Sequence, residues 1–154
     1  MAKKSAFKYT KADDSPGFLL WKVTALWQAK LSTVLEQFGL TQTQYAILAS
    51  LRWFEEQKEP TTQSHLVEHA KIDKMTLSKA IRNLEEQGFV ARTPSPQDSR
   101  ATNVRFTAKG RSVVQKAIVA IENADDEFFS CLPKNRLEIY KTLTQQIIRQ
   151  GGTL

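Results

Sequence analysis

The sequence predicts a mainly α-helical fold with one small two-stranded β-hairpin, an α+β fold. Three observations support this prediction. Apolar residues recur at three- and four-residue steps through most of the chain, which is the spacing of amphipathic helices. Helix-capping residues precede these segments, and glycines or prolines follow them. One region breaks the pattern, because two short stretches rich in Val, Phe and Thr flank the polar loop "SPQDSRATN".

The chain should begin with a flexible basic arm, residues 1–14, because lysines are frequent there and apolar residues are few. The lysines are Lys3, Lys4, Lys8 and Lys11. Ordered structure should start at Ser15 and Pro16, since Ser caps helices and Pro fits a first helical turn. A long first helix should then run until Gly39. Its apolar positions are Phe18, Leu19, Val23, Leu26, Val34 and Phe38.

Two further helices are predicted from their capping residues. The segment from Thr41 to Gln44 has the form of a capping box, so a second helix should start there and end before Pro60. A short third helix should be capped by Thr62 and run through Ala70. These helices should lead directly into a fourth.

The fourth helix, from Lys74 to Gln87 between its cap Asp73 and Gly88, carries the strongest functional signal. The third and fourth helices together form a helix-turn-helix, which can place its second helix in the DNA major groove. At about 100° per residue, one arc holds apolar residues and the opposite arc holds residues that can bind base edges or phosphates. The apolar arc is Leu77, Ala80, Ile81 and Leu84, and the opposite arc is Met75, Ser78, Lys79 and Arg82. A solvated helix face is the competing interpretation.

The hairpin is predicted from strands at Phe89–Thr93 and Thr102–Phe106. Arg100 stands at its tip, where a guanidinium can enter the narrow, electronegative minor groove. Asp98 can pair with that guanidinium or with loop amides and so fix the shape of the loop. From Phe89 to Arg111, five basic residues stand against one acidic residue, Asp98. The basic residues are Arg92, Arg100, Arg105, Lys109 and Arg111.

Two long helices should complete the chain. Thr107 should cap the first, and Pro133 should end it and start the last helix, which closes at Gly151 and Gly152. Their apolar positions are Val113, Val114, Ile118, Ile121 and Phe128, then Leu137, Tyr140, Ile147 and Ile148. The first and the last two helices carry more apolar surface than one thin lobe can cover, so we expect a partner chain.

Composition narrows the class of protein. The 154 residues suit one domain, and the net charge of +6 with a pI near 9.5 favours nucleic acid as a partner. The single cysteine, Cys131, indicates a reducing, cytoplasmic location and should be buried or half-buried. No apolar run suits a signal peptide or a membrane span. No catalytic set or phosphate loop can be recognised, so we expect neither an enzyme nor a cofactor.

A metal site is also not expected. His65 and His69 are four residues apart on one helix, which is a spacing that can bind a metal. The nearby Glu68 should point elsewhere. We therefore expect two histidines that are exposed or near phosphates.

Three stretches carry a resemblance to a known family. They are "LTQTQYAILASL", "TTQSHLVEHAKIDKMTLSKAIRNLEEQGFVART" and "PSPQDSRATNVRFTAKG". The wing motif D-x-R stands here as Asp98, Ser99 and Arg100, and the motif L-T-x-x-G as residues 106–110, with Phe in place of Leu. From about Gly17 to its end, the chain resembles the MarR family of winged helix-turn-helix transcriptional regulators.

The resemblance implies a winged helix-turn-helix domain joined to a helical dimerisation region. Residues 15–154 would form one unit, with dimerisation helices at 15–40 and 107–154 and the DNA-binding part at 41–106. A homodimer would bind a palindromic operator in double-stranded DNA, as a repressor, with half-sites about 34 Å apart. The expected DNA-binding residues are Thr62, Gln63, Ser64, Lys74, Thr76, Ser78, Lys79, Arg82, Arg92, Asp98 and Arg100.

The resemblance also suggests an effector, because some members bind phenolic or aromatic carboxylate ligands between the dimerisation and DNA-binding parts. A small aromatic effector would suit a cleft with aromatic walls and one cation, and ordinary core packing is the competing interpretation. The candidate residues are Trp21, Trp27, Tyr45, Trp53 and Arg52. The alternative function for the chain is a dimeric winged-helix interaction module without specific DNA binding, and the retained Arg100 argues against it.

Overall fold

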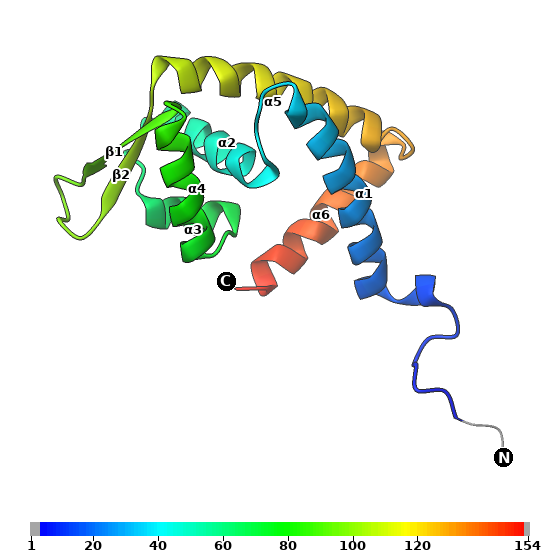
Figure 1. The fold of residues 1–154 in the computed structure, drawn as a ribbon. Coiled ribbons are helices and arrows are strands. Elements are labelled where there is room, and N and C mark those ends of the chain that lie inside the picture. Colours follow the sequence, from blue (N-terminus) through cyan, green and yellow to red (C-terminus); the bar gives the residue numbers. More distant parts are fainter. Residues whose placement is uncertain (1–3, 153–154) are drawn as a thin grey trace.

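The computed structural model describes residues 4–152, which fold into six α-helices, one short 3-10 helix and a two-stranded antiparallel sheet (Figure 1). In chain order the elements are η1 (Ala12–Asp14), α1 (Pro16–Glu36), α2 (Gln42–Glu56), α3 (Gln63–Ala70), α4 (Lys74–Glu86), β1 (Val90–Pro94), β2 (Thr102–Phe106), α5 (Ala108–Phe128) and α6 (Lys134–Gln150). The predicted mainly α fold with one small hairpin is therefore confirmed. The first three residues of the expected basic arm and the last two residues of the chain lie outside the described part.

Side-chain caps start five of the helices, at the positions that the sequence predicts. The capping residues are Ser15, Thr41, Thr62, Asp73 and Thr107. Each side chain accepts a hydrogen bond from the backbone N–H three residues ahead, which satisfies a donor that a helix start leaves free. The capping box at Thr41 is complete, because Gln44 Oε1 accepts a hydrogen bond from Thr41 N at 3.0 Å.

The described part of the N-terminal arm contains a short turn that the sequence did not predict. Ala12–Asp14 forms the 3-10 helix η1, directly before α1. Lys22 Nζ lies 2.7 Å from Asp13 Oδ1, and this salt bridge joins the end of the arm to α1. Both side chains are largely exposed, so the pair stabilises the junction only weakly.

The hydrophobic core lies between the helix-turn-helix, the hairpin and the first half of α5. α2 packs against α3, α4 and α5, and α1 packs against the other end of α5 (Figure 1). The fully buried large side chains are Leu35, Ile47, Leu48, Leu66, Leu77, Ile81, Leu84, Val90 and Val114. This core holds α3, α4 and the hairpin in one unit.

The hairpin projects from this unit and is tied back to it at its base (Figure 1). β1 and β2 pair in the register Val90 to Phe106 and Pro94 to Thr102, so β1 starts one residue later than predicted. Val104 N donates a hydrogen bond to Thr61 O at 2.8 Å, which adds the segment before α3 to the outer side of β2. The start of α3 is therefore joined to the hairpin through backbone pairing.

Gly110 allows α5 to cross the entry to β1 at very short range. A Cβ atom at this position would lie 1.9 Å from Phe89 O and 2.9 Å from Phe89 Cα. Thr107, the cap of α5, also donates a hydrogen bond to Gly88 O at 2.6 Å. Glycine at the fourth position of "TAKG" is thus required by a backbone contact.

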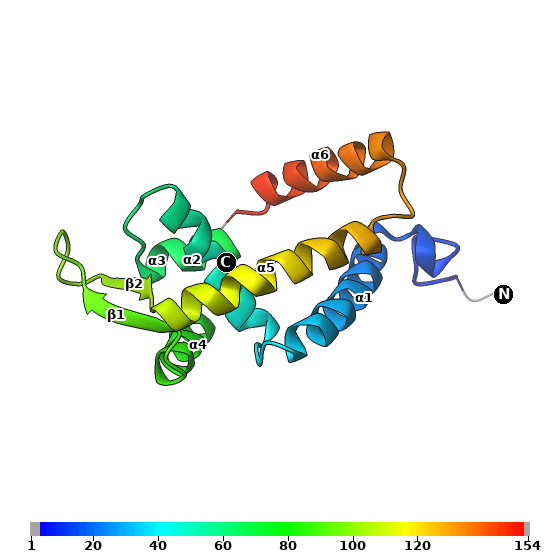
Figure 2. The ribbon, with the colours of Figure 1, turned by 90° about the horizontal axis from the view of Figure 1, so that it is seen from above.

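α6 turns back from the end of α5 and lies apart from it as a ribbon (Figure 2). None of its residues is buried, although its apolar stripe is present as predicted. The end of α6 approaches the helix-turn-helix, where Lys71 Nζ donates a hydrogen bond to Gly152 O at 3.1 Å. Within residues 4–152, no helix is both long and apolar enough to cross a membrane.

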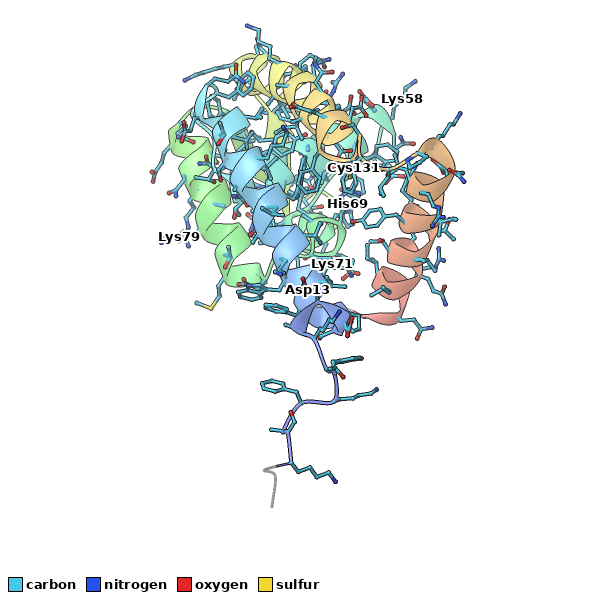
Figure 3. The ribbon with its side chains drawn as sticks, turned by 90° about the vertical axis from the view of Figure 1, so that its right-hand side faces the viewer. Asp13, Lys58, His69, Lys71, Lys79 and Cys131 are labelled. Carbon is cyan, nitrogen blue, oxygen red and sulfur yellow. The ribbon has the colours of Figure 1, made fainter. Side chains whose placement is uncertain are left out.

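The expectation for Cys131 is wrong, because its side chain is exposed. Cys131 lies in the turn between α5 and α6, beyond the last buried position of α5 at Ala124 (Figure 3). Tyr140 of α6 packs against Phe129 in this turn, but within residues 4–152 the thiol of Cys131 stays exposed.

Candidate nucleic-acid interface

α4 presents the outward face that the sequence predicts. Its apolar arc is buried in the core, while the side chains on the opposite arc are exposed, apart from the half-buried Ser78. Lys79 points away from the body of the molecule (Figure 3). An open hollow of about 600 Å³ runs along this face and is lined by Lys74, Met75, Thr76, Ser78, Lys79 and Arg82. The expected DNA-contacting residues of α4 therefore share one surface. They are Lys74, Thr76, Ser78, Lys79 and Arg82.

The start of α4 is fixed by a local hydrogen-bond network. Asp73 Oδ1 accepts a hydrogen bond from Thr76 N at 2.9 Å. Hydrogen bonds from the side chain and the backbone of Thr76 hold the pKa of Asp73 below its ordinary value, so the cap remains a carboxylate. Lys71 makes the turn between α3 and α4 in a left-handed conformation, with φ at 52°, and pairs with Glu68 at 2.7 Å. Glu68 thus points away from the two histidines, as expected.

The start of α3 lies beside the base of the hairpin. Thr62 uses its hydroxyl as the helix cap, Gln63 is half-buried, and Ser64 is exposed. A hollow of about 510 Å³ separates this helix start from the hairpin and includes Ser64, Asp98 and Asn103 in its lining. Backbone and hydroxyl donors at such a helix start can hold a phosphate.

The hairpin loop carries Arg100 at its tip, with the side chain 90% exposed. Asp98 Oδ1 accepts a hydrogen bond from Arg100 N at 3.0 Å and another from Arg100 Nε at 3.3 Å. Asp98 thus holds both the loop amide and the guanidinium, which are the two roles that the sequence suggests for it. The exposed guanidinium keeps its remaining donors available to an anionic partner.

Arg92 differs from this pattern, because its guanidinium is paired within the protein. Arg92 Nε and Nη2 lie 3.2 and 3.1 Å from the two carboxylate oxygens of Glu85, and Arg92 N donates to Glu85 Oε2 at 3.0 Å. These hydrogen bonds also lower the pKa of Glu85. Arg92 therefore joins α4 to β1, in addition to its expected role at the DNA.

The excess of positive charge counted from Phe89 to Arg111 is partly neutralised in the structure, because acidic residues from earlier in the chain pair with two of the arginines. Arg111 is also paired, with both of its contacts on the carboxylate of Glu55 at 3.0 Å. Arg111 hydrogen bonds lower the pKa of Glu55, and Glu55 raises the pKa of Arg111. The count from Phe89 to Arg111 missed both acids because Glu55 and Glu85 come earlier in the chain.

The five candidate ligand residues have separate surroundings in the part of the chain that the structure describes. Trp21 is 72% exposed on α1, whereas Trp27 packs edge-to-face against Phe128. Arg52 pairs with Glu55 at 2.7 Å and with Glu56 at 3.1 Å. The fourth candidate, Tyr45, is half-buried; burial, together with Glu122 and Asp125, raises its pKa to about 12. Trp53, which the sequence also suggested, is exposed.

The two histidines have local partners. His65 Nδ1 accepts a hydrogen bond from Thr62 N at 3.3 Å, which completes a capping box at the start of α3. His69 Nδ1 lies 2.9 Å from Ser50 Oγ, and its ring packs edge-to-face on Phe54. In the stretch from residue 4 to residue 152, no cluster of three His, Cys, Asp or Glu side chains could hold a metal ion.

The fold defines a winged helix-turn-helix protein, with α3 and α4 as the helix-turn-helix and the β1–β2 hairpin as the wing. A model of the MarR family matches residues 40–102. The uncharacterized HTH-type transcriptional regulator YdcH of Bacillus subtilis is 35% identical over 127 residues, which are 82% of this chain and 86% of that protein. The chain belongs to the MarR family. This membership confirms both the resemblance seen in the sequence and the expectation of a transcriptional regulator rather than an enzyme.

Two solved structures show the same fold. CouR from Rhodococcus jostii RHA1, bound to p-coumaroyl-CoA, is 25% identical, with a TM-score of 0.79 over 90% of this chain and 95% of that chain. MepR from S. aureus, in a complex with DNA, is 21% identical, with a TM-score of 0.80 over 92% of this chain and 100% of that chain.

Proposed function

We propose that this regulator is a homodimeric repressor that binds a palindromic operator in double-stranded DNA. The observation that carries the proposal is the outward face of α4, where Lys74, Thr76, Lys79 and Arg82 line one open hollow and are all exposed. Such a face matches the width and the hydrogen-bonding groups of the major groove. The same fold in MepR was solved with DNA, which supports the use of the fold on a duplex.

The residues divide into three roles. Arg82, Lys79, Ser78 and Thr76 contact base edges from the recognition helix. The start of α3, with Thr62, Gln63 and Ser64, contacts phosphates, as does Lys74. Arg100 enters the minor groove from the wing, with Asp98 holding the loop in shape. Arg92 contacts DNA only at its outer edge, because Glu85 occupies most of its guanidinium.

The dimer is supported by apolar surface at both ends of the chain. The exposed large apolar residues of α1 and α6 are Phe18, Leu19, Leu20, Trp21, Leu26, Ile139, Tyr140, Leu143, Ile147 and Ile148. Soluble monomers rarely expose so much contiguous apolar surface. A second copy covers it under two-fold symmetry and places two recognition helices on successive turns of one duplex, about 34 Å apart.

A small aromatic acid or its conjugate is the effector class that we propose. CouR was solved with p-coumaroyl-CoA, an aromatic ligand. In this chain the half-buried Trp27 and Tyr45 supply aromatic walls and Arg52 supplies a cation. Because these residues have separate surroundings within residues 4–152, we expect the partner chain to complete the cleft.

Enrichment of random duplex DNA on the purified protein tests the proposal. A palindromic motif supports it, and the absence of any motif favours the alternative, a dimeric interaction module without specific DNA binding. Light scattering should give the mass of two chains, and a monomer would contradict the proposal.

Two variants test the assigned roles. Arg82→Ala should weaken operator binding by about 1 to 3 kcal/mol and relax the preference at one base pair of each half-site. The matched control is Lys116→Ala, which removes one exposed positive charge from α5 at a residue outside the proposed interface. Equal dissociation constants for these two variants in a gel-shift titration would contradict the proposed contact of Arg82 with the operator. Arg100→Ala should lose the preference for A·T-rich flanks, and unchanged binding to flank-randomised operators would refute the wing assignment.

A further inference from the structure

Met75 is the least explained side chain on the recognition helix. It is 83% exposed, and within residues 60–106, all of which the structure describes, it is the one large apolar side chain in the exposed class. The other exposed apolar residues of the helices lie mainly on α1 and α6, where a partner chain can cover them. Core packing and dimerisation therefore do not account for Met75.

Met75 lies at the start of α4, on its outward face. It is the second residue of α4, directly after Lys74, and it lines the hollow on the outward face. Helical side chains lean toward the N-terminus of their helix, and the N-terminal residues of a recognition helix are those that contact base edges. Asp73 caps the helix at this point by accepting a hydrogen bond from Thr76 N, the residue after Met75.

The chemistry of Met75 limits what it can recognise. Its thioether has no hydrogen-bond donor and only a weak acceptor, while its flexible, polarizable end makes favourable apolar contacts. The edges of the bases in the major groove display donors and acceptors, with one apolar group, the C5 methyl of thymine. The neighbours of Met75 on this face, Lys74 and Thr76, are polar and are suited to the other groups.

We propose that Met75 is a specificity-determining residue that contacts a thymine methyl group at one position in each half-site. This inference rests on the proposed operator binding and adds to it the identity of one base pair. It requires a thymine at the position that faces the start of α4.

Thymine-to-uracil replacement tests the contact, because deoxyuridine lacks only the C5 methyl. In the enriched operator, each thymine is replaced in turn, and dissociation constants are measured by gel shift for the wild type and for Met75→Ala. Loss of one methyl contact should weaken wild-type binding about fourfold at one position, and about fifteenfold when both half-sites are replaced. Met75→Ala should bind the thymine and uracil operators equally well.

Two further variants keep the test specific to the methyl contact. Met75→Leu retains an apolar end. Like the wild type, it should bind more weakly when uracil replaces thymine at the same position. Lys116→Ala lies outside the proposed interface and should keep the full wild-type ratio between thymine and uracil operators. Both variants retain helix-forming residues on an exposed surface, so the fold should be preserved.

The possible failures can be told apart. If no thymine in a bound operator is sensitive to uracil replacement, or if Met75→Ala keeps the wild-type sensitivity, this inference is overturned while operator binding stands. If no operator is enriched at all, the proposed function fails and this inference fails with it.

Discussion

Gly110 determines how closely α5 can approach the wing, and its replacement gives a strong prediction. A Cβ added there would lie 1.9 Å from the carbonyl oxygen of Phe89 and 2.7 Å from its carbonyl carbon. A carbonyl group in the backbone cannot rotate away, as the end of a flexible side chain could. Gly110→Ala therefore forces the first turn of α5 away from the residue that leads into β1.

Two opposing effects set the magnitude. Ala is favoured over Gly within a helix by about 1 kcal/mol. Overpacking of a well-packed site costs about 1 to 3 kcal/mol or more, and displacement of the backbone lies at the upper end. We expect Gly110→Ala to lower the free energy of unfolding by about 2 kcal/mol. Gly17→Ala is the matched control, because no atom lies within 4 Å of the added Cβ and α1 should gain up to about 1 kcal/mol.

Urea denaturation followed by circular dichroism measures both variants. Protein concentrations must be equal, because the stability of a dimer depends on protomer concentration. The midpoint should fall for Gly110→Ala and rise or stay constant for Gly17→Ala, without a change in the slope. Operator binding of the folded Gly110→Ala variant should also weaken, since its wing is displaced. Equal midpoints for the two variants would refute the close approach of α5 to the wing.

Three further predictions concern single side chains. Burial and two acidic neighbours raise the pKa of Tyr45 from 10.0 to about 12. As the pH rises from 10.0 to about 12, the wild type should therefore lose more stability in urea denaturation than Tyr45→Phe does. Equal losses would contradict the raised pKa. Hydrogen bonds from Arg111 hold the pKa of Glu55 below 4.5, so the extra stability of the wild type over Glu55→Gln should be present at neutral pH and shrink as the pH falls below 4.5, whereas a constant difference would rule out this origin. Thr107→Val removes the hydroxyl that caps α5 and donates to Gly88 O; thermal unfolding should show a loss of about 1 to 2 kcal/mol, and an unchanged midpoint would contradict the cap.

The helix boundaries could be predicted because their signals are local. A cap needs one hydroxyl or carboxylate and a backbone N–H three residues ahead, and both are visible in the sequence at Thr41 and Asp73. The arc of α4 could also be predicted, because Leu77, Ile81 and Leu84 follow the period of the helix and are buried. The candidate site within α4 thus follows directly from the order of its residues.

The partners of the charged side chains could not be predicted in the same way. Glu55 and Arg111 are 56 residues apart in the sequence and meet only because α2 packs against α5. Glu85 and Arg92 are seven residues apart, but a turn separates them, so their pairing depends on the angle between α4 and β1. Charge counted along the chain therefore overestimates the charge that the wing can offer to a partner.

The prediction that Cys131 is buried or half-buried was wrong for a different reason. Free cysteines are usually buried, but this average applies to residues that face a core. Cys131 lies in a turn beyond the core, and no residue of the helix after it is buried. Its exposure depends on chain topology, which residue type does not encode.

The pairing at the two outer sides of the wing also protects the protein against self-association through strands. A two-stranded sheet has two open edges, and free N–H groups on an edge can recruit strands from other molecules. Here Thr61 accepts from Val104 on the β2 side, Glu85 accepts from Arg92 on the β1 side, and Pro94 has no N–H to offer. The projecting hairpin is thus a poor template for strands from other molecules.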